Sequence, residues 1–88
     1  MEEKYLKLKE QLDLLEWPNV YMFKFIVPSD NQLIARVTNM FSQVSEISMR
    51  PSAKGNYTSI TIKEVMTDSD SVIKIYQDTE KIKGVIVI

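Results

Sequence analysis

From residue 20 onward, short segments that are rich in β-branched and aromatic residues, or apolar at every second residue, alternate with segments of helical spacing. Residues 20–27, 46–50, 57–65 and 85–88 are predicted strands, and helical spacing fills the two long intervals between them. The order is therefore strand, helix, strand, strand, helix, strand. Two split strand–helix–strand units with right-handed crossovers build a four-stranded antiparallel sheet, in spatial order 4-1-3-2, with both helices on one face. We predict an α+β ferredoxin-like βαββαβ plait over residues 20–88.

Capping residues and apolar stripes mark the two helices of this unit. Ser29 is the predicted N-cap of the first helix, and Gln32 three residues later completes a capping box. Thr67 or Asp68 is the predicted cap of the second helix. The expected inward stripes are Leu33, Ile34, Val37, Met40, Phe41 and Val44 in the first helix, and Val72, Ile75, Tyr76 and Thr79 in the second.

A further helix is predicted before the plait, over residues 2–16. Its apolar stripe is Tyr5, Leu8, Leu12 and Leu15, and it ends before Pro18, because the residue preceding a proline is disfavoured in a helix. Such a helix either packs on its own domain or docks on a partner protein. The chain is expected to form one domain, 1–88, consisting of this helix and the plait.

The strand alternation predicts two different faces for the sheet. If Phe23, Phe25, Ile60 and Ile62 face the helices, the outer face carries an apolar zone and a polar zone. An exposed apolar zone usually marks an interface, so we expect it to be covered by the N-terminal helix, by a second copy in a homodimer, or by a partner protein. The apolar zone is Met22, Ile26, Ile86 and Ile88, and the polar zone is Ser48, Arg50, Tyr57, Ser59, Thr61 and Lys63.

The turn between the second and third strands is a candidate ligand site. Its backbone N–H groups, two hydroxyls and two cationic side chains are groups that bind a small anion such as phosphate or carboxylate. The structural alternative is a hairpin that needs glycine for a positive φ and proline to end the strand. The candidate ligand-binding residues are Arg50, Ser52, Lys54, Gly55, Asn56, Tyr57 and Ser59.

The sequence lacks the side chains on which most catalysis and metal binding depend. Among its 88 residues there is neither cysteine nor histidine, so it has no thiol nucleophile, no disulfide and no imidazole base or ligand. The carboxylates do not form a constellation of nucleophile, base and orienting group. We therefore predict a protein that is not an enzyme, with no cofactor and no metal site.

Charge and hydropathy narrow the choice of partners. Eleven basic and twelve acidic residues give a net charge of −1, unlike the basic footprint of most nucleic-acid-binding domains. Plaits that bind RNA stack bases on aromatic residues of strands one and three, and here the outer face offers only Tyr57. No apolar run reaches membrane-spanning length and the N-terminus does not resemble a secretory signal, so the expected location is the cytoplasm.

Two motifs resemble a known family. The run Pro51-Ser52-Ala53-Lys54-Gly55-Asn56-Tyr57 and the run Leu14-Leu15-Glu16-Trp17-Pro18 are similar to the signatures of the YbeD-like bacterial proteins, domain of unknown function 493. The resemblance implies a fold like that of ACT regulatory domains and a small regulatory or adaptor module. Some members are labelled lipoate regulatory proteins, which implies enzymes of lipoate metabolism as partners. Lys54 itself lacks the acidic neighbour usual at a lipoyl attachment site.

Overall fold

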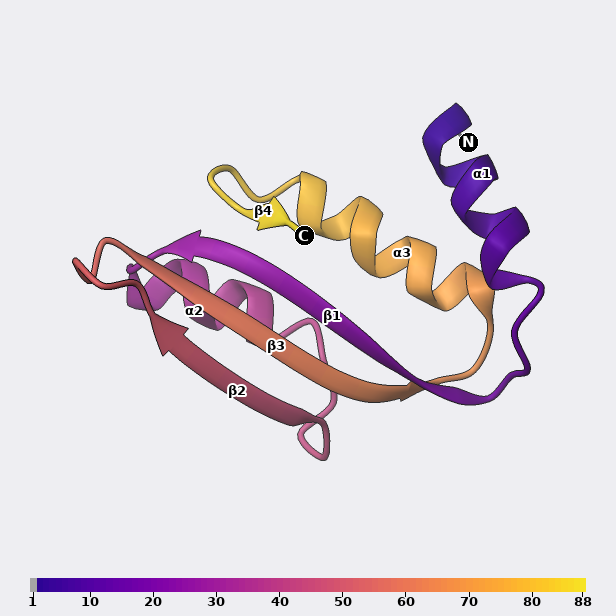
Figure 1. Cartoon of the computed structure of the whole chain (residues 1–88), viewed down its shortest axis with the longest axis horizontal. Coiled ribbons are helices and arrows are strands. Elements are labelled where there is room, and N and C mark those ends of the chain that lie inside the picture. The colour runs from indigo at the N-terminus through magenta and orange to yellow at the C-terminus, as the bar shows by residue number, and fades with distance from the viewer. Residues whose placement is uncertain (1) are drawn as a thin grey trace.

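The computed structural model describes residues 2–88, which form a plait with an additional N-terminal helix (Figure 1). The sheet order is β2-β3-β1-β4 with every neighbouring pair antiparallel, which confirms the predicted ferredoxin-like topology. The elements in chain order are α1 (Glu3–Leu12), β1 (Asn19–Pro28), α2 (Asn31–Thr38), β2 (Glu46–Pro51), β3 (Tyr57–Met66), α3 (Ser69–Glu80) and β4 (Ile86–Val87).

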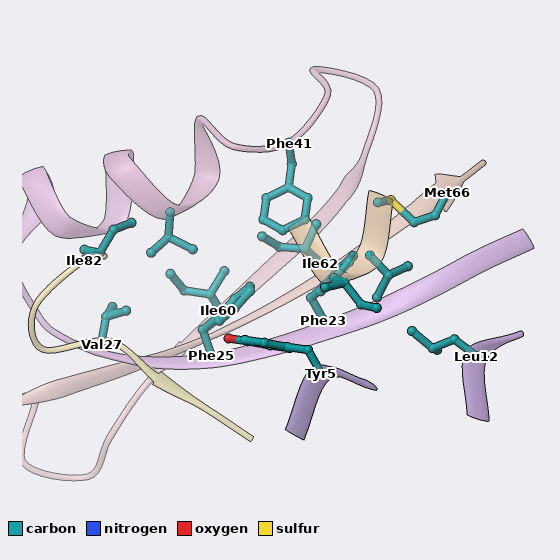
Figure 2. Packing of buried hydrophobic residues seen from close by; sticks show 13 residues of the cluster. Tyr5, Leu12, Phe23, Phe25, Val27, Phe41, Ile60, Ile62, Met66 and Ile82 are labelled. Atoms are coloured by element: carbon teal, nitrogen blue, oxygen red, sulfur yellow. The ribbon is translucent and has the colours of Figure 1, made fainter. Parts of the chain in front are cut away.

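The core lies between the sheet and the helices. In the central pair, Phe23 lies opposite Ile62 and Phe25 opposite Ile60, and none of these four side chains is exposed. Because side chains alternate along a strand, this register sends all four toward the helices and their neighbours to the outer face. Figure 2 shows them at the centre of the cluster, with Phe41 approaching from another side. The predicted inner face is confirmed.

Helix α1 is shorter than predicted and packs against α3. It ends at Leu12 instead of residue 16, and the indole Nε1 of Trp17 donates a hydrogen bond of 2.9 Å to the Leu12 carbonyl. The same carbonyl also accepts the Leu15 N–H at 3.0 Å, an i to i+3 bond of the kind that closes the last turn of a helix. Leu15 therefore lies in the turn after the helix and is exposed, so its place in the predicted stripe is wrong. Tyr5 and Leu12 are buried as predicted.

Two predictions for the first plait helix are also wrong. The N-cap of α2 is Asp30, whose carboxylate accepts backbone bonds from Gln32 and Leu33. The Ser29 hydroxyl is instead engaged with the Thr58 hydroxyl of β3, at 2.9 Å. Since α2 ends at Thr38, Val44 lies outside the helix and is 91% exposed rather than part of the inward stripe.

The second plait helix begins as expected. Asp68 is the N-cap of α3, and it forms a capping box with Ser71. Val72 and Thr79 are buried as predicted, and so is Ile73, which the predicted stripe did not include. The last strand, β4, comprises only Ile86–Val87 and is thus shorter than the predicted 85–88.

Candidate functional site

The outer face of the sheet lies open to solvent. Helix α1 packs on α3, in the layer on the other side of the sheet, so it is not the cover that the outer face was expected to need. Met22 in β1 is 55% exposed, as is Ile86 in β4, and Ile88 is more exposed still. Ile26 lies opposite Ile86 and is half-buried. The register thus brings the four predicted interface residues onto one uncovered face.

Two further apolar side chains extend this patch. Val20 lies opposite Val65 at the far end of the β1–β3 pair, and both side chains are largely exposed. Sequence reasoning did not include them among the interface residues, although both occupy outward positions of the alternation. We refer to Val20, Met22, Ile26, Val65, Ile86 and Ile88 as the apolar outer patch.

The charged side chains of the outer face are mainly basic. The strand register places Lys24, Lys63 and Arg50 on this face together with one acidic side chain, Glu46. Three positive charges against one negative give the face a net charge of +2, whereas the whole chain carries −1. A complementary surface would therefore combine apolar and acidic side chains.

A shallow hollow of about 370 Å³ lies where the outer face meets the β2–β3 hairpin. Four of the seven predicted ligand-binding residues line it, namely Arg50, Ser52, Tyr57 and Ser59, joined by Ile26 and Pro51. Lys54, Gly55 and Asn56 do not line it and belong to the turn beyond it. The hollow therefore has one cationic side chain, Arg50, beside hydroxyl groups and apolar walls.

Hydrogen bonds within the hairpin occupy several of the groups proposed for anion binding. The Gly55 N–H donates to the Ser52 carbonyl at 2.9 Å, and the Tyr57 N–H donates to the Ser52 hydroxyl at 3.2 Å. The Ser59 hydroxyl donates to the Arg50 carbonyl at 3.4 Å. Gly55 has a φ of +76°, a backbone angle that residues with a Cβ rarely adopt. The turn thus needs these groups for its own geometry.

A second hollow, of about 260 Å³, lies between α1, α3 and β4. Tyr5, Tyr76, Leu8 and Val87 make its wall mainly apolar, and Lys4 and Glu80 form an ion pair at its edge. Sequence reasoning missed this site. Its residues come from both ends of the chain, and no short-range pattern links them.

Polar contacts hold α1 antiparallel to α3 along this seam. Besides Lys4 and Glu80, Lys9 lies 3.2 Å from a carboxylate oxygen of Asp70, and the Ser69 hydroxyl donates to Asp13 at 2.5 Å. The hydrogen bond from Lys4 lowers the pKa of the Glu80 carboxyl, and that from Ser69 lowers the pKa of the Asp13 carboxyl. Both carboxylates thus favour the docked helix in their charged form.

This seam predicts a loss of stability in acid. A carboxyl whose pKa is lowered by folding contributes stability above its unfolded pKa, and the contribution disappears as pH falls through the folded value. The unfolded values are 4.5 for Glu80 and 3.8 for Asp13, so we expect unfolding free energy to fall as pH drops below about 4.5. Urea titrations between neutral pH and acid should show a shallower dependence in the double variant Glu80→Gln/Asp13→Asn.

The matched control for this prediction is Glu10→Gln, because Glu10 is an exposed carboxylate of the same helix. Its pH dependence should follow that of the wild type. If the unfolding free energy of the double variant fell in acid as steeply as that of the wild type, the seam carboxylates would not contribute to the loss of stability.

Among residues 2–88, no group of three or more carboxylates is gathered in a way that could hold a metal ion. No helix in the described part of the chain is long and apolar enough to cross a membrane. The fold and the open sheet face together define a small plait domain with a free face.

The chain belongs to the family described as protein of unknown function (DUF493), which matches residues 13–88. It is 34% identical over 76 residues to a UPF0250 protein of Shewanella frigidimarina, covering 82% of this chain and 86% of the relative. It is 27% identical over 77 residues to a UPF0250 protein of Shewanella halifaxensis, covering 83% and 88%. No solved structure matches. The family resemblance read from the hairpin motif is thereby confirmed, and α1 precedes the matched region.

Proposed function

We propose that this protein is a small, non-catalytic regulatory or adaptor module that binds another protein through the outer face of its sheet. The observation that supports this most strongly is the apolar outer patch, which α1 leaves uncovered. Patches of this kind on small domains usually serve as contact surfaces. The net charge of +2 on the same face favours a partner surface that combines apolar with acidic side chains.

The proposed partner acts in the cytoplasm, the location favoured by the sequence. Enzymes of lipoate metabolism are the first candidates, because of the label carried by some members of the family. In this role the domain changes the activity or location of its partner by occupying part of the partner's surface. It needs no reacting group of its own.

The test is a quantitative comparison of proteins captured from native lysate by four tagged versions of the chain. These are the wild type, Met22→Glu, Ile86→Glu and Leu14→Glu, with half of each sample treated with nuclease. Leu14 is 86% exposed and lies in the turn after α1, so its variant controls for adding a charge at an apolar surface site. A partner captured by the wild type and the control, but at least tenfold less by the two patch variants, would support the proposal.

Partners captured equally by all four versions would contradict a role for the outer face. Partners lost on nuclease treatment would instead indicate a nucleic-acid-dependent association. Each variant should first be shown to melt within a few degrees of the wild type, because exposed substitutions change unfolding free energy only slightly.

A second candidate function is the binding of a small anion in the hairpin hollow. It is favoured by the convergence of Arg50 with the Ser52, Tyr57 and Ser59 side chains around a single depression. A ligand that binds only the folded state raises the melting temperature by mass action. Inorganic phosphate, acetate and succinate are suitable probes.

The geometry makes this second candidate testable by two charge removals. Any rise in melting temperature should be lost in Arg50→Gln, since Arg50 lines the hollow, and retained in Lys54→Gln, since Lys54 does not. Loss in the Lys54 variant alone would locate the anion at the turn instead. No rise with any of the probes would contradict binding of these anions.

A further inference from the structure

Strand β2 forms an edge of the sheet, and its six residues are all exposed. Its inward side chains lie beside the core, with Ile47 opposite Ile62 and Met49 opposite Ile60. Ile47 is nevertheless 40% exposed and Met49 is 52% exposed. In Figure 1, β2 is the outermost strand, and no other element of residues 2–88 runs along its free side. Unpaired edges with apolar side chains are templates for pairing with another strand.

The register shows which backbone groups face this free side. In an antiparallel sheet, the N–H and C=O of one residue point to the same neighbour, and alternate residues point to opposite neighbours. The Ser52 N–H donates to the Tyr57 carbonyl, so the backbone N–H and C=O of Ser52 point toward β3. At two-residue steps back along the strand, the backbone groups of Arg50, Ser48 and Glu46 also point toward β3. The N–H and C=O groups of Ile47 and Met49 therefore point away from the sheet.

The edge is complementary to itself. If two copies of β2 pair antiparallel about a twofold axis at Ser48, then Ile47 of one copy lies opposite Met49 of the other. Their outward backbone groups then form four hydrogen bonds, two for each Ile47–Met49 pair. On the outer face, Glu46 of each copy lies opposite Arg50 of the other, which places opposite charges together twice. Pro51, which has no N–H, ends the ladder.

We propose that two copies of this chain associate through β2 in this register. The sheets then join into one of eight strands, with the helices of both copies on the same face. Pairing satisfies the free N–H and C=O groups and covers Ile47 and Met49 on the helix face. A shift by one residue would leave the outward N–H and C=O groups of Ile47 and Met49 without partners. A shift by two residues would keep hydrogen bonding but move Glu46 away from the partner's Arg50, so the register with Ser48 on the axis is the one that satisfies both. This contact is separate from the apolar outer patch.

The first test uses the absence of cysteine from the chain. Ser48 residues on the axis form a non-hydrogen-bonded pair, with Cα atoms about 4.5 Å apart, within the range of a disulfide. Ser48→Cys should therefore form a disulfide-linked dimer under mild oxidation. The control is Thr61→Cys, on the same face of the neighbouring strand β3, which is directly opposite Ser48 within one copy. It should form no disulfide-linked dimer under the same conditions, although the non-covalent contact through β2 remains.

The second test is an exchange of charges, read as solution mass by analytical ultracentrifugation over a range of protein concentrations. Glu46→Arg and Arg50→Glu each place like charges opposite one another twice, so each should weaken self-association by about tenfold or more. An equimolar mixture of the two variants should dimerise again. In that mixture, each Arg faces a Glu of the other chain. The double variant Glu46→Arg/Arg50→Glu should also recover association.

These outcomes decide the proposal. Recovery in the mixture, together with crosslinking of Ser48→Cys alone, establishes the contact and its register. A wild-type chain that remains monomeric at all concentrations overturns it. So does a dimer that is unaffected by the charge changes, or one that is lost in Met22→Glu instead, which would place the contact on the outer face. Failure of the partner-capture experiment leaves this contact standing, because that experiment changes Met22 and Ile86, which the β2 contact does not use.

Discussion

Replacing Phe23 by alanine is expected to lower the free energy of unfolding by about 3–5 kcal/mol. The Phe23 side chain is fully buried in the middle of β1. Its ring centroid lies 4.9 Å from that of Tyr21, 5.1 Å from that of Phe41 and 5.5 Å from that of Tyr76. Truncation would leave a cavity lined from β1, from α3 and from the connection after α2, and close-packed interiors collapse only partially around such cavities.

Urea denaturation followed by circular dichroism measures this effect. The matched control is Met22→Ala, one residue earlier on the same strand but on the outer face, where removal of the side chain should change stability by less than about 0.5 kcal/mol. Because small domains are stable by only about 5–15 kcal/mol, the Phe23 variant is expected to be close to unfolding. Equal effects of the two substitutions would contradict the assignment of the two sheet faces.

Replacing Leu12 by alanine is expected to cost about 2–5 kcal/mol. Leu12 is the last residue of α1 and only 4% exposed, and Figure 2 shows it at the edge of the core cluster, near the end of α1. The expectation is informative because α1 precedes the region that matches the family. If α1 is integral to the fold, Leu12→Ala should lower the urea concentration at the midpoint of a single unfolding transition of the whole domain.

The control is Leu14→Ala, two residues later, where the side chain is exposed and the change should be within about 0.5 kcal/mol. Urea denaturation monitored by Trp17 fluorescence reports directly on this region, because the indole is bonded to the Leu12 carbonyl. A Leu12 variant as stable as the control would show that α1 docks too weakly to matter for folding.

The plait itself could be predicted because its signals are local. The alternation along residues 57–65 places Ile60 and Ile62 on one face wherever the strand is paired, and that face is buried. Asp68 caps α3 with groups only three residues away. In each case, the residues that decide the structure lie within one turn or one strand of each other.

The errors arose where a distant contact or a competing neighbour decided the outcome. Ser29 and Asp30 are both good caps, and the structure uses Asp30, while Ser29 is engaged by Thr58 of β3. Ile73 lies outside the stripe expected for α3 and is nevertheless buried. Both α1 and the sheet pack against α3, so a wider face of this helix is covered than the sheet alone would cover.

The candidate surfaces were likewise predictable where a local pattern decides them and unpredictable where distant residues meet. Strand alternation placed Met22, Ile26, Ile86 and Ile88 together on the outer face, since a two-residue period assigns every side chain of a paired strand to one side. The hairpin hollow was only partly predicted: Lys54 does not line it, whereas Ile26 does, because this β1 residue lies opposite Ser59 of β3.

The amino-acid sequence alone determined the order of the elements, the two faces of the sheet, the family and the absence of cysteine and histidine chemistry. Only the tertiary structure decided that α1 packs on α3 and leaves the outer face open, and that β2 keeps a free edge with Ile47 and Met49 exposed. The physical reason is that periodicity specifies which side of an element is apolar. Which element covers that side depends on packing between residues far apart in the chain.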